Sequence, residues 1–178
     1  IWVLAIAVSA ANVGISLLSP AIPQLRDDLM VTSDEAQLVL SAFLIMLGVG
    51  QLIAGSLSDR IGRRPVLVYG SLLFLLSGLG ALFSTSIEML VAMRIFQGLG
   101  AATCMAMGRV IISDSFQRAE AGRQMSTITM FQSVVPLLGF AFGGVMADLV
   151  GWRGSVGLMV VTAAIVFLGT SLLLAESR

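Results

Sequence analysis

Long apolar stretches separated by short polar connections dominate this chain. Each stretch has about 18 to 24 residues, enough for a helix rising roughly 1.5 Å per residue to cross about 30 Å of bilayer hydrocarbon. The expected spans are residues 1–18, 36–57, 65–83, 89–112, 125–147 and 156–174. The first residue is Ile rather than Met, so we read the chain as a fragment that lacks its natural start. The pattern predicts an all-α membrane protein with six transmembrane helices.

Two spans follow an N-terminal capping pattern, in which a hydroxyl and a carboxylate three residues apart bind free backbone N–H groups. Thr32 with Glu35 precedes the second span, and Thr85 with Glu88 precedes the fourth. We therefore assign Glu35 and Glu88 a structural role.

Arginine is distributed unevenly between the connections. The connections after the second and fourth spans, with the end of the fourth span, carry Arg60, Arg63, Arg64, Arg109, Arg118 and Arg123. The connections on the opposite side carry only Arg26 and Arg153. The positive-inside rule places the first set in the cytoplasm, so both ends of the chain are expected there.

A repeat with an offset of 89 residues runs through the chain. Gly50, Gly55, Asp59, Gly62 and Arg64 recur as Gly139, Gly144, Asp148, Gly151 and Arg153. The offset spans three helices, an odd number, so the two copies must lie in opposite orientations. We predict one bundle, residues 1–178, built as a 3+3 inverted repeat of residues 1–88 and 89–178.

Composition removes several classes of function. The 178 residues are 57% hydrophobic and 11% charged, so a lipid bilayer is the expected solvent. A net charge of zero argues against a nucleic-acid partner. The chain has no His, one Cys (Cys104), and no clustered nucleophile, metal ligands or phosphate-binding loop. We therefore expect no enzyme activity, no metal and no cofactor.

Polar residues inside the spans indicate which helices face the interior. Amide or charged side chains occur in the first, second, fourth and fifth spans. The polar side chains of the third and sixth spans are hydroxyls alone. Polar groups in a membrane tend to face protein or a water-filled cavity, so the third and sixth spans should face lipid. The candidate cavity residues are Asn12, Gln97, Met105 and Gln132.

The connection after the second span reads GSLSDRIGRRP over residues 55–65. Gly62 permits a sharp turn, and Pro65 suits the first turn of the next helix. Asp59 lies near a helix C-terminus, where its charge opposes the helix dipole, so it needs a cation or a helix N-terminus as partner. An arginine-rich topogenic loop would explain the three arginines but not Asp59 and the glycines.

This segment resembles the signature loop between the second and third helices of the major facilitator superfamily. Residues 94–102 resemble its fourth-helix motif, and residues 136–144 resemble the fifth-helix motif of its antiporters. Residues 20–23, 37–43 and 151–153 are similar to the bicyclomycin and chloramphenicol resistance branch of the drug/proton antiporters. The resemblance implies the N-terminal half of a twelve-helix transporter of the bacterial inner membrane, partnered by a missing C-terminal six-helix half.

The resemblance also implies a conformational latch at the cytoplasmic end. Asp59 would contact a helix N-terminus of the missing half in the outward-open state. Arg63 would bridge Asp59 to Asp114. The residues assigned to the latch are Gly55, Asp59, Arg60, Gly62, Arg63, Arg64 and Asp114.

Arg94 is the candidate coupling residue. It lies about two turns inside the fourth span, where a cation costs roughly 2.5–3.5 kcal/mol on insertion scales. A positive charge favours the ionised form of a nearby carboxylate, so moving the two apart would capture a proton. The alternative is an arginine that snorkels to anchor the helix at the outer interface.

The fifth span is expected to bend and pack closely through Pro136, Gly139, Gly143 and Gly144. Two residues depart from the antiporter pattern. Phe140 stands where the motif usually has Pro, and Ser16 stands where related efflux proteins often carry an acid. No acid lies well within any of the six spans, so the proton-binding carboxylate is at an interface, in the missing half, or absent.

The expected function is export of small amphipathic drugs by alternating access, driven by proton entry. One alternative is a facilitator or symporter of a small metabolite. The other is a non-transporting membrane receptor on the same helices.

Overall fold

The computed structural model describes residues 2–173, which form seven α-helices and one short 3-10 helix. The elements are α1 (Trp2–Ser16), η1 (Ser19–Ala21), α2 (Ile22–Leu29), α3 (Ser33–Ile61), α4 (Arg63–Leu82), α5 (Ile87–Ser115), α6 (Arg118–Val150) and α7 (Trp152–Leu173). Six segments are long and apolar enough to cross a membrane, with α1, η1 and α2 forming the first of them. The six predicted spans are therefore confirmed.

The first crossing is interrupted, whereas the sequence pattern indicated one continuous span over residues 1–18. Helix α1 ends at Ser16, a 3-10 turn follows at Ser19–Ala21, and α2 continues to Leu29. Pro20 explains the interruption, because it has no N–H to donate and its ring clashes with the carbonyl four residues earlier. Pro23 then lies in the first turn of α2, where proline is tolerated.

One of the two predicted caps is confirmed and the other is wrong. Thr32 and Glu35 form a reciprocal capping box at the start of α3, with both backbone N–H groups bonded. Before α5, however, the cap is Ser86, whose Oγ accepts from the N–H of Met89 at 3.3 Å. Because α5 begins at Ile87, Glu88 occupies its second position and cannot close a box with Thr85.

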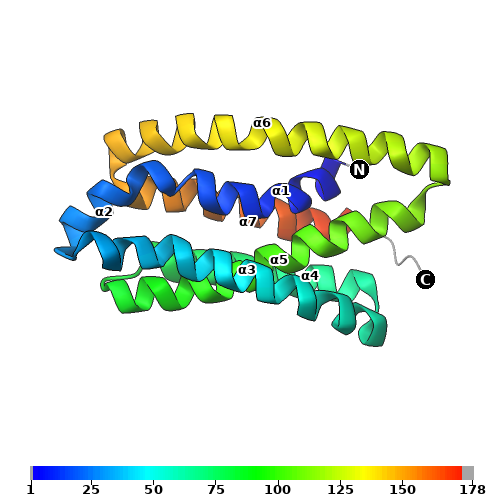
Figure 1. The fold of residues 1–178 in the computed structure, drawn as a ribbon, viewed down its shortest axis with the longest axis horizontal. Coiled ribbons are helices and arrows are strands. Elements are labelled where there is room, and N and C mark those ends of the chain that lie inside the picture. The colour runs from blue at the N-terminus through cyan, green and yellow to red at the C-terminus, as the bar shows by residue number, and fades with distance from the viewer. Residues whose placement is uncertain (1, 174–178) are drawn as a thin grey trace.

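Helices α1 and α5 form the centre of the elongated bundle (Figure 1). Helix α3 packs on α5, α6 packs on α1, and α4 and α7 pack on each other and on the central pair. When α1, α3 and α4 are exchanged with α5, α6 and α7, the α3–α5, α4–α5 and α3–α4 contacts correspond to α6–α1, α7–α1 and α6–α7. This symmetry is what an inverted three-helix repeat requires; the boundary between residues 88 and 89 stays a prediction.

Backbone geometry repeats at the same offset of 89 residues. Gly62 ends α3 with φ 93°, and Gly151 ends α6 with φ 84°. A Cβ on Gly50 would lie 2.7 Å from the Cβ of Ala102 in α5, and a Cβ on Gly139 would collide with Ser16 in α1. Glycine at these positions therefore lets α3 approach α5 and α6 approach α1 in the same way.

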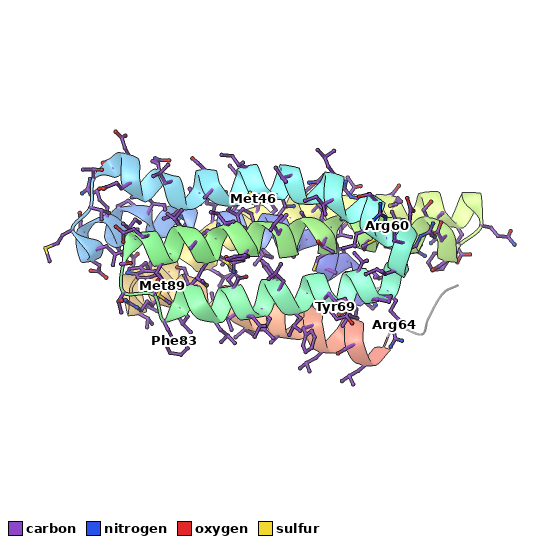
Figure 2. The ribbon with its side chains drawn as sticks, turned by 90° about the horizontal axis from the view of Figure 1, so that it is seen from below. Met46, Arg60, Arg64, Tyr69, Phe83 and Met89 are labelled. Carbon is purple, nitrogen blue, oxygen red and sulfur yellow. The ribbon has the colours of Figure 1, made fainter. Side chains whose placement is uncertain are left out.

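Two arginines at equivalent positions hold the ends of α4 and α7 together. Arg64, at the start of α4, donates to the carbonyl of Ser171 in the last turn of α7 (3.3 Å). Arg153, at the start of α7, donates to the carbonyl of Ser84 just after α4 (2.9 Å). A cation beside free C-terminal carbonyls is worth about 0.3–1 kcal/mol. Figure 2 shows Arg60 and Arg64 at one end of the bundle, opposite Phe83 and Met89. We call the end with Arg60 and Arg64 the Arg63 end, and the end with Phe83 and Met89 the Glu35 end.

We predict that Gly143→Ala destabilises the full-length protein while Gly144→Ala does not. A Cβ on Gly143 would collide with the backbone carbonyl of Leu17, whereas a Cβ on Gly144 would meet only Pro20 at an ordinary 3.9 Å. Overpacking of this kind costs about 1–3 kcal/mol, and a tolerated Gly→Ala change in a helix gains up to about 1 kcal/mol. Thermal unfolding of the two purified variants measures the difference, and equal midpoints would contradict the close α1–α6 contact.

Candidate functional site

Arg94 lies inside the bundle with only 1% of its surface exposed. Its guanidinium donates to the carbonyl of Gly14 in α1 (2.6 Å) and, through Nε, to the carbonyl of Val39 in α3 (3.3 Å). It also donates to Oε1 of Gln97, one turn further along α5 (2.7 Å). Arg94 therefore connects α5 to α1 and α3 rather than reaching for the membrane surface, which excludes the snorkelling alternative.

Two further side chains complete the surroundings of Arg94. The ring of Phe43 in α3 lies 4.2 Å from the guanidinium carbon, and the sulfur of Met159 in α7 lies 3.5 Å from Nη1. A desolvated cation–π contact is worth about 2 kcal/mol, and a hydrogen bond to a charged group about 1.5–3 kcal/mol. Together these contacts offset an insertion cost of roughly 2.5–3.5 kcal/mol.

The acceptor for Arg94 on α1 exists because that helix stops early. The last four carbonyls of a helix have no partner within it, and Gly14 lies in the last turn of α1. Gly14 also has no side chain to displace Phe43, whose Cζ would lie 2.6 Å from a Cβ there. The interruption at Pro20 thus supplies a free carbonyl, and Gly14 leaves room for the aromatic ring.

No carboxylate lies within 4 Å of Arg94 among the side chains that the structure describes. Its hydrogen-bond partners are all neutral: two backbone carbonyls, an amide and a thioether. The carboxylate that coupling requires is therefore not part of this cluster.

Asn12 and Gln132, two of the four predicted cavity residues, lie together between α1 and α6. The Nδ2 of Asn12 donates to the backbone carbonyl of Gln132 (3.2 Å), and the Nε2 of Gln132 donates to the carbonyl of Val8 (3.3 Å). The Oε1 of Gln132 accepts from Arg109 of α5 (3.1 Å). Arg109 is the residue that the sequence reasoning missed, because it was counted only among the arginines that set orientation.

The other two predicted cavity residues lie elsewhere. Met105 is partly buried and its sulfur lies 3.8 Å from the Nε2 of Gln51 in α3. Gln97 is fully buried, with Oε1 on Arg94 and Nε2 beside Gly78 of α4. The structure therefore places Gln97 in the Arg94 cluster and not on a surface shared with Asn12 and Gln132.

A separate apolar pocket of about 360 Å³ lies between α1, α6 and α7. It is lined by Val13, Leu17, Leu138, Gly139, Phe142 and Val161, among others. None of the four predicted cavity residues lines it. The described residues contain no group of three or more His, Cys, Asp or Glu side chains that could hold a metal ion.

The predicted latch is only partly assembled within this chain. Arg63, the first residue of α4, forms an ion pair with Asp114 in the last turn of α5. Each residue opposes the dipole of its own helix, so pairing relieves both unfavourable interactions. Asp59 is exposed and has no ion pair among the described side chains, and Arg64 instead contacts Ser171. The expected bridge from Arg63 to Asp59 is therefore absent from this structure.

We predict that exchanging the two charges of the Arg63–Asp114 pair preserves or raises the stability of the protein. Either single change, Arg63→Asp or Asp114→Arg, should lower the free energy of unfolding by up to about 1 kcal/mol, as for a partly exposed pair. The double variant restores the pair and places each charge favourably on its helix dipole, so it should match or exceed the parent. Thermal unfolding of the full-length protein at low and high salt measures this, and a double variant no better than the singles would contradict it.

Known proteins match this six-helix unit over most of its length. The family model of the Major Facilitator Superfamily matches residues 4–178. The chloramphenicol resistance protein of Pseudomonas aeruginosa is 34% identical over 148 residues, covering 80% of this chain and 34% of that protein. Multidrug resistance protein D of Escherichia coli (strain K12) is 33% identical over 165 residues, covering 92% of this chain and 42% of that protein. The chain thus spans less than half the length of these relatives.

The fold matches solved transporters as well. A crystal structure of a D-xylose-proton symporter superposes with a TM-score of 0.86 at 16% identity, covering 99% of this chain and 48% of that chain. The names of the sequence relatives agree with the drug/proton antiporter branch that the motifs indicated, and the family is one of transporters rather than enzymes. The chain belongs to the Major Facilitator Superfamily and folds as a six-helix half of its twelve-helix transporters.

Proposed function

We propose that the full-length protein exports small amphipathic drugs by alternating access coupled to proton entry. The observation that carries this proposal is Arg94, a charge enclosed by carbonyls of α1 and α3 within the membrane. The drug-resistance names of the two sequence relatives support the direction and class of substrate.

Arg94 would couple protonation to helix movement through competition between its partners. Hydrogen bonds between two charged groups are stronger than those from a cation to a neutral carbonyl. An ionised carboxylate that reached Arg94, from the other half or from an interface, would take the guanidinium away from Gly14 and Val39. Protonation of that carboxylate would return Arg94 to the carbonyls and close α1 and α3 onto α5.

The Arg63 end would face the cytoplasm and carry the latch. Its concentration of arginines supports this orientation, in which the helices cross a bacterial inner membrane and both ends of the chain lie on the cytoplasmic side. Asp59 is exposed at this end, so it is free to contact a helix N-terminus of the C-terminal half, the expected partner. The Arg63–Asp114 pair would fix the position of α4 against α5 during that contact.

A facilitator or symporter of a small metabolite is the second candidate, and Ser16 favours it. Ser16 is buried, donates to the carbonyl of Asn12 (2.7 Å) and packs against Gly139. A longer acidic side chain would collide with α6 at this position. The chain therefore has no room for the acid that related efflux proteins often carry there.

We predict that Arg94→Ala abolishes proton-driven drug accumulation in the full-length protein. Arg94→Lys should reduce it by roughly tenfold or more, because an ammonium cannot bond to both carbonyls and the amide in the same planar geometry. Drug exchange without a proton gradient should survive in Arg94→Lys. Proteoliposome assays measure proton-driven accumulation and gradient-free drug exchange separately.

Arg26→Ala is the matched control, since Arg26 is exposed at the Glu35 end and, within residues 2–173, forms an ion pair with its neighbour Asp27 alone. Unchanged proton-driven accumulation in Arg94→Ala would overturn the coupling assignment. Equal loss of both modes in Arg94→Lys would show that Arg94 only supports the fold.

A further inference from the structure

One face of the bundle, which we call the open face, carries Asn12, Gln51, Met105, Arg109 and Gln132. Met105 of α5 reaches Gln51 of α3, and Arg109, one turn further along α5, reaches Gln132 of α6. A different side of α5 packs on α4, where a Cβ on Gly100 would lie 2.6 Å from the backbone N of Phe74. The open face therefore lies between α3 and α6, on the side of α5 turned away from α4.

Arg109 gives this face a positive charge that nothing in the described part of the chain neutralises. The side chain is exposed, and no described carboxylate lies within 4 Å of it. Its hydrogen-bond partner in the described part of the chain is the neutral Oε1 of Gln132. The described acidic residues all lie in the first or last turn of a helix, whereas Arg109 lies more than one turn inside α5.

Gln132 fixes the position of this charge. Its Nε2 is held by the carbonyl of Val8, and its backbone carbonyl accepts from Asn12. The amide is therefore oriented with Oε1 towards Arg109. A guanidinium has five N–H donors in a planar fork, so the donors not used by Gln132 remain available to a ligand.

We infer that Arg109 sets the charge preference of the transport cavity: it binds anionic substrates, or neutral substrates rich in carbonyl or nitro oxygens, and disfavours cations. This inference rests on the proposed function, because it takes the open face as the wall of that cavity. A planar donor fork matches a carboxylate or a pair of acceptor oxygens, and a like charge close to Arg109 is repelled.

The test uses two ions of the same shape and opposite charge, tetraphenylborate and tetraphenylphosphonium, with the purified full-length protein. Equilibrium binding of each gives an affinity ratio. The Arg109→Gln variant lacks the positive charge, so its affinity ratio should shift by roughly tenfold or more in favour of tetraphenylphosphonium. Arg109→Lys should keep most of the preference, and Arg123→Gln, which removes another exposed arginine from the first part of α6, should leave it unchanged.

If the Arg109→Gln variant unfolds at the same temperature as the parent and its affinity ratio for the two ions is unchanged, the inference is overturned. Failure of both ions to bind a protein that still transports chloramphenicol would also overturn it, while leaving drug export intact. Absence of any drug transport by the unaltered protein would instead overturn the proposed function itself. A ratio shift that Arg109→Lys reverses would support the inference over a purely structural role.

Discussion

The buried guanidinium of Arg94 is the constraint on which the rest of the bundle depends. A charge in an apolar interior must find acceptors, and regular helices have already used their carbonyls internally. The chain meets this need by ending α1 at Ser16, which leaves the carbonyl of Gly14 free, and by placing Phe43 against the open side of the guanidinium. The interruption of the first helix and the position of α3 are thus linked to one side chain.

The sequence predicted the features that depend on local pattern or on the repeat. Six apolar runs, the Thr32–Glu35 box and the equivalent turns at Gly62 and Gly151 all follow from neighbouring residues or from a fixed offset. Gly139 was expected to allow close packing, and the structure adds that its neighbour is Ser16. The sequence sufficed here because each feature is decided by composition along one segment or by a repeated position, and not by the direction of a single side chain.

Features that depend on which way a side chain points could not be predicted in this way. Gln97 and Arg109 are both polar residues in one helix, yet Gln97 is buried against Arg94 and Arg109 reaches across to α6. Their difference is set by the rotation of α5 between its neighbours, which no single-helix pattern records. The cap is Ser86 and not the predicted Thr85; the two are adjacent hydroxyl residues that can both cap a helix, so the pattern did not decide between them.

The inverted repeat separates the scaffold of this protein from its chemistry. Several positions that shape the bundle obey the offset of 89 residues, as the reciprocal contacts of Arg64 and Arg153 do. The buried charge and the amide that holds Arg109 break it: the counterpart of Arg94 is Ala5, and that of Gln132 is Phe43. A symmetric pair of buried arginines would double the desolvation cost and leave α1 and α5 equally fixed. Because the charge lies in one copy, a change in the hydrogen-bond partners of Arg94 can move one half of the bundle relative to the other.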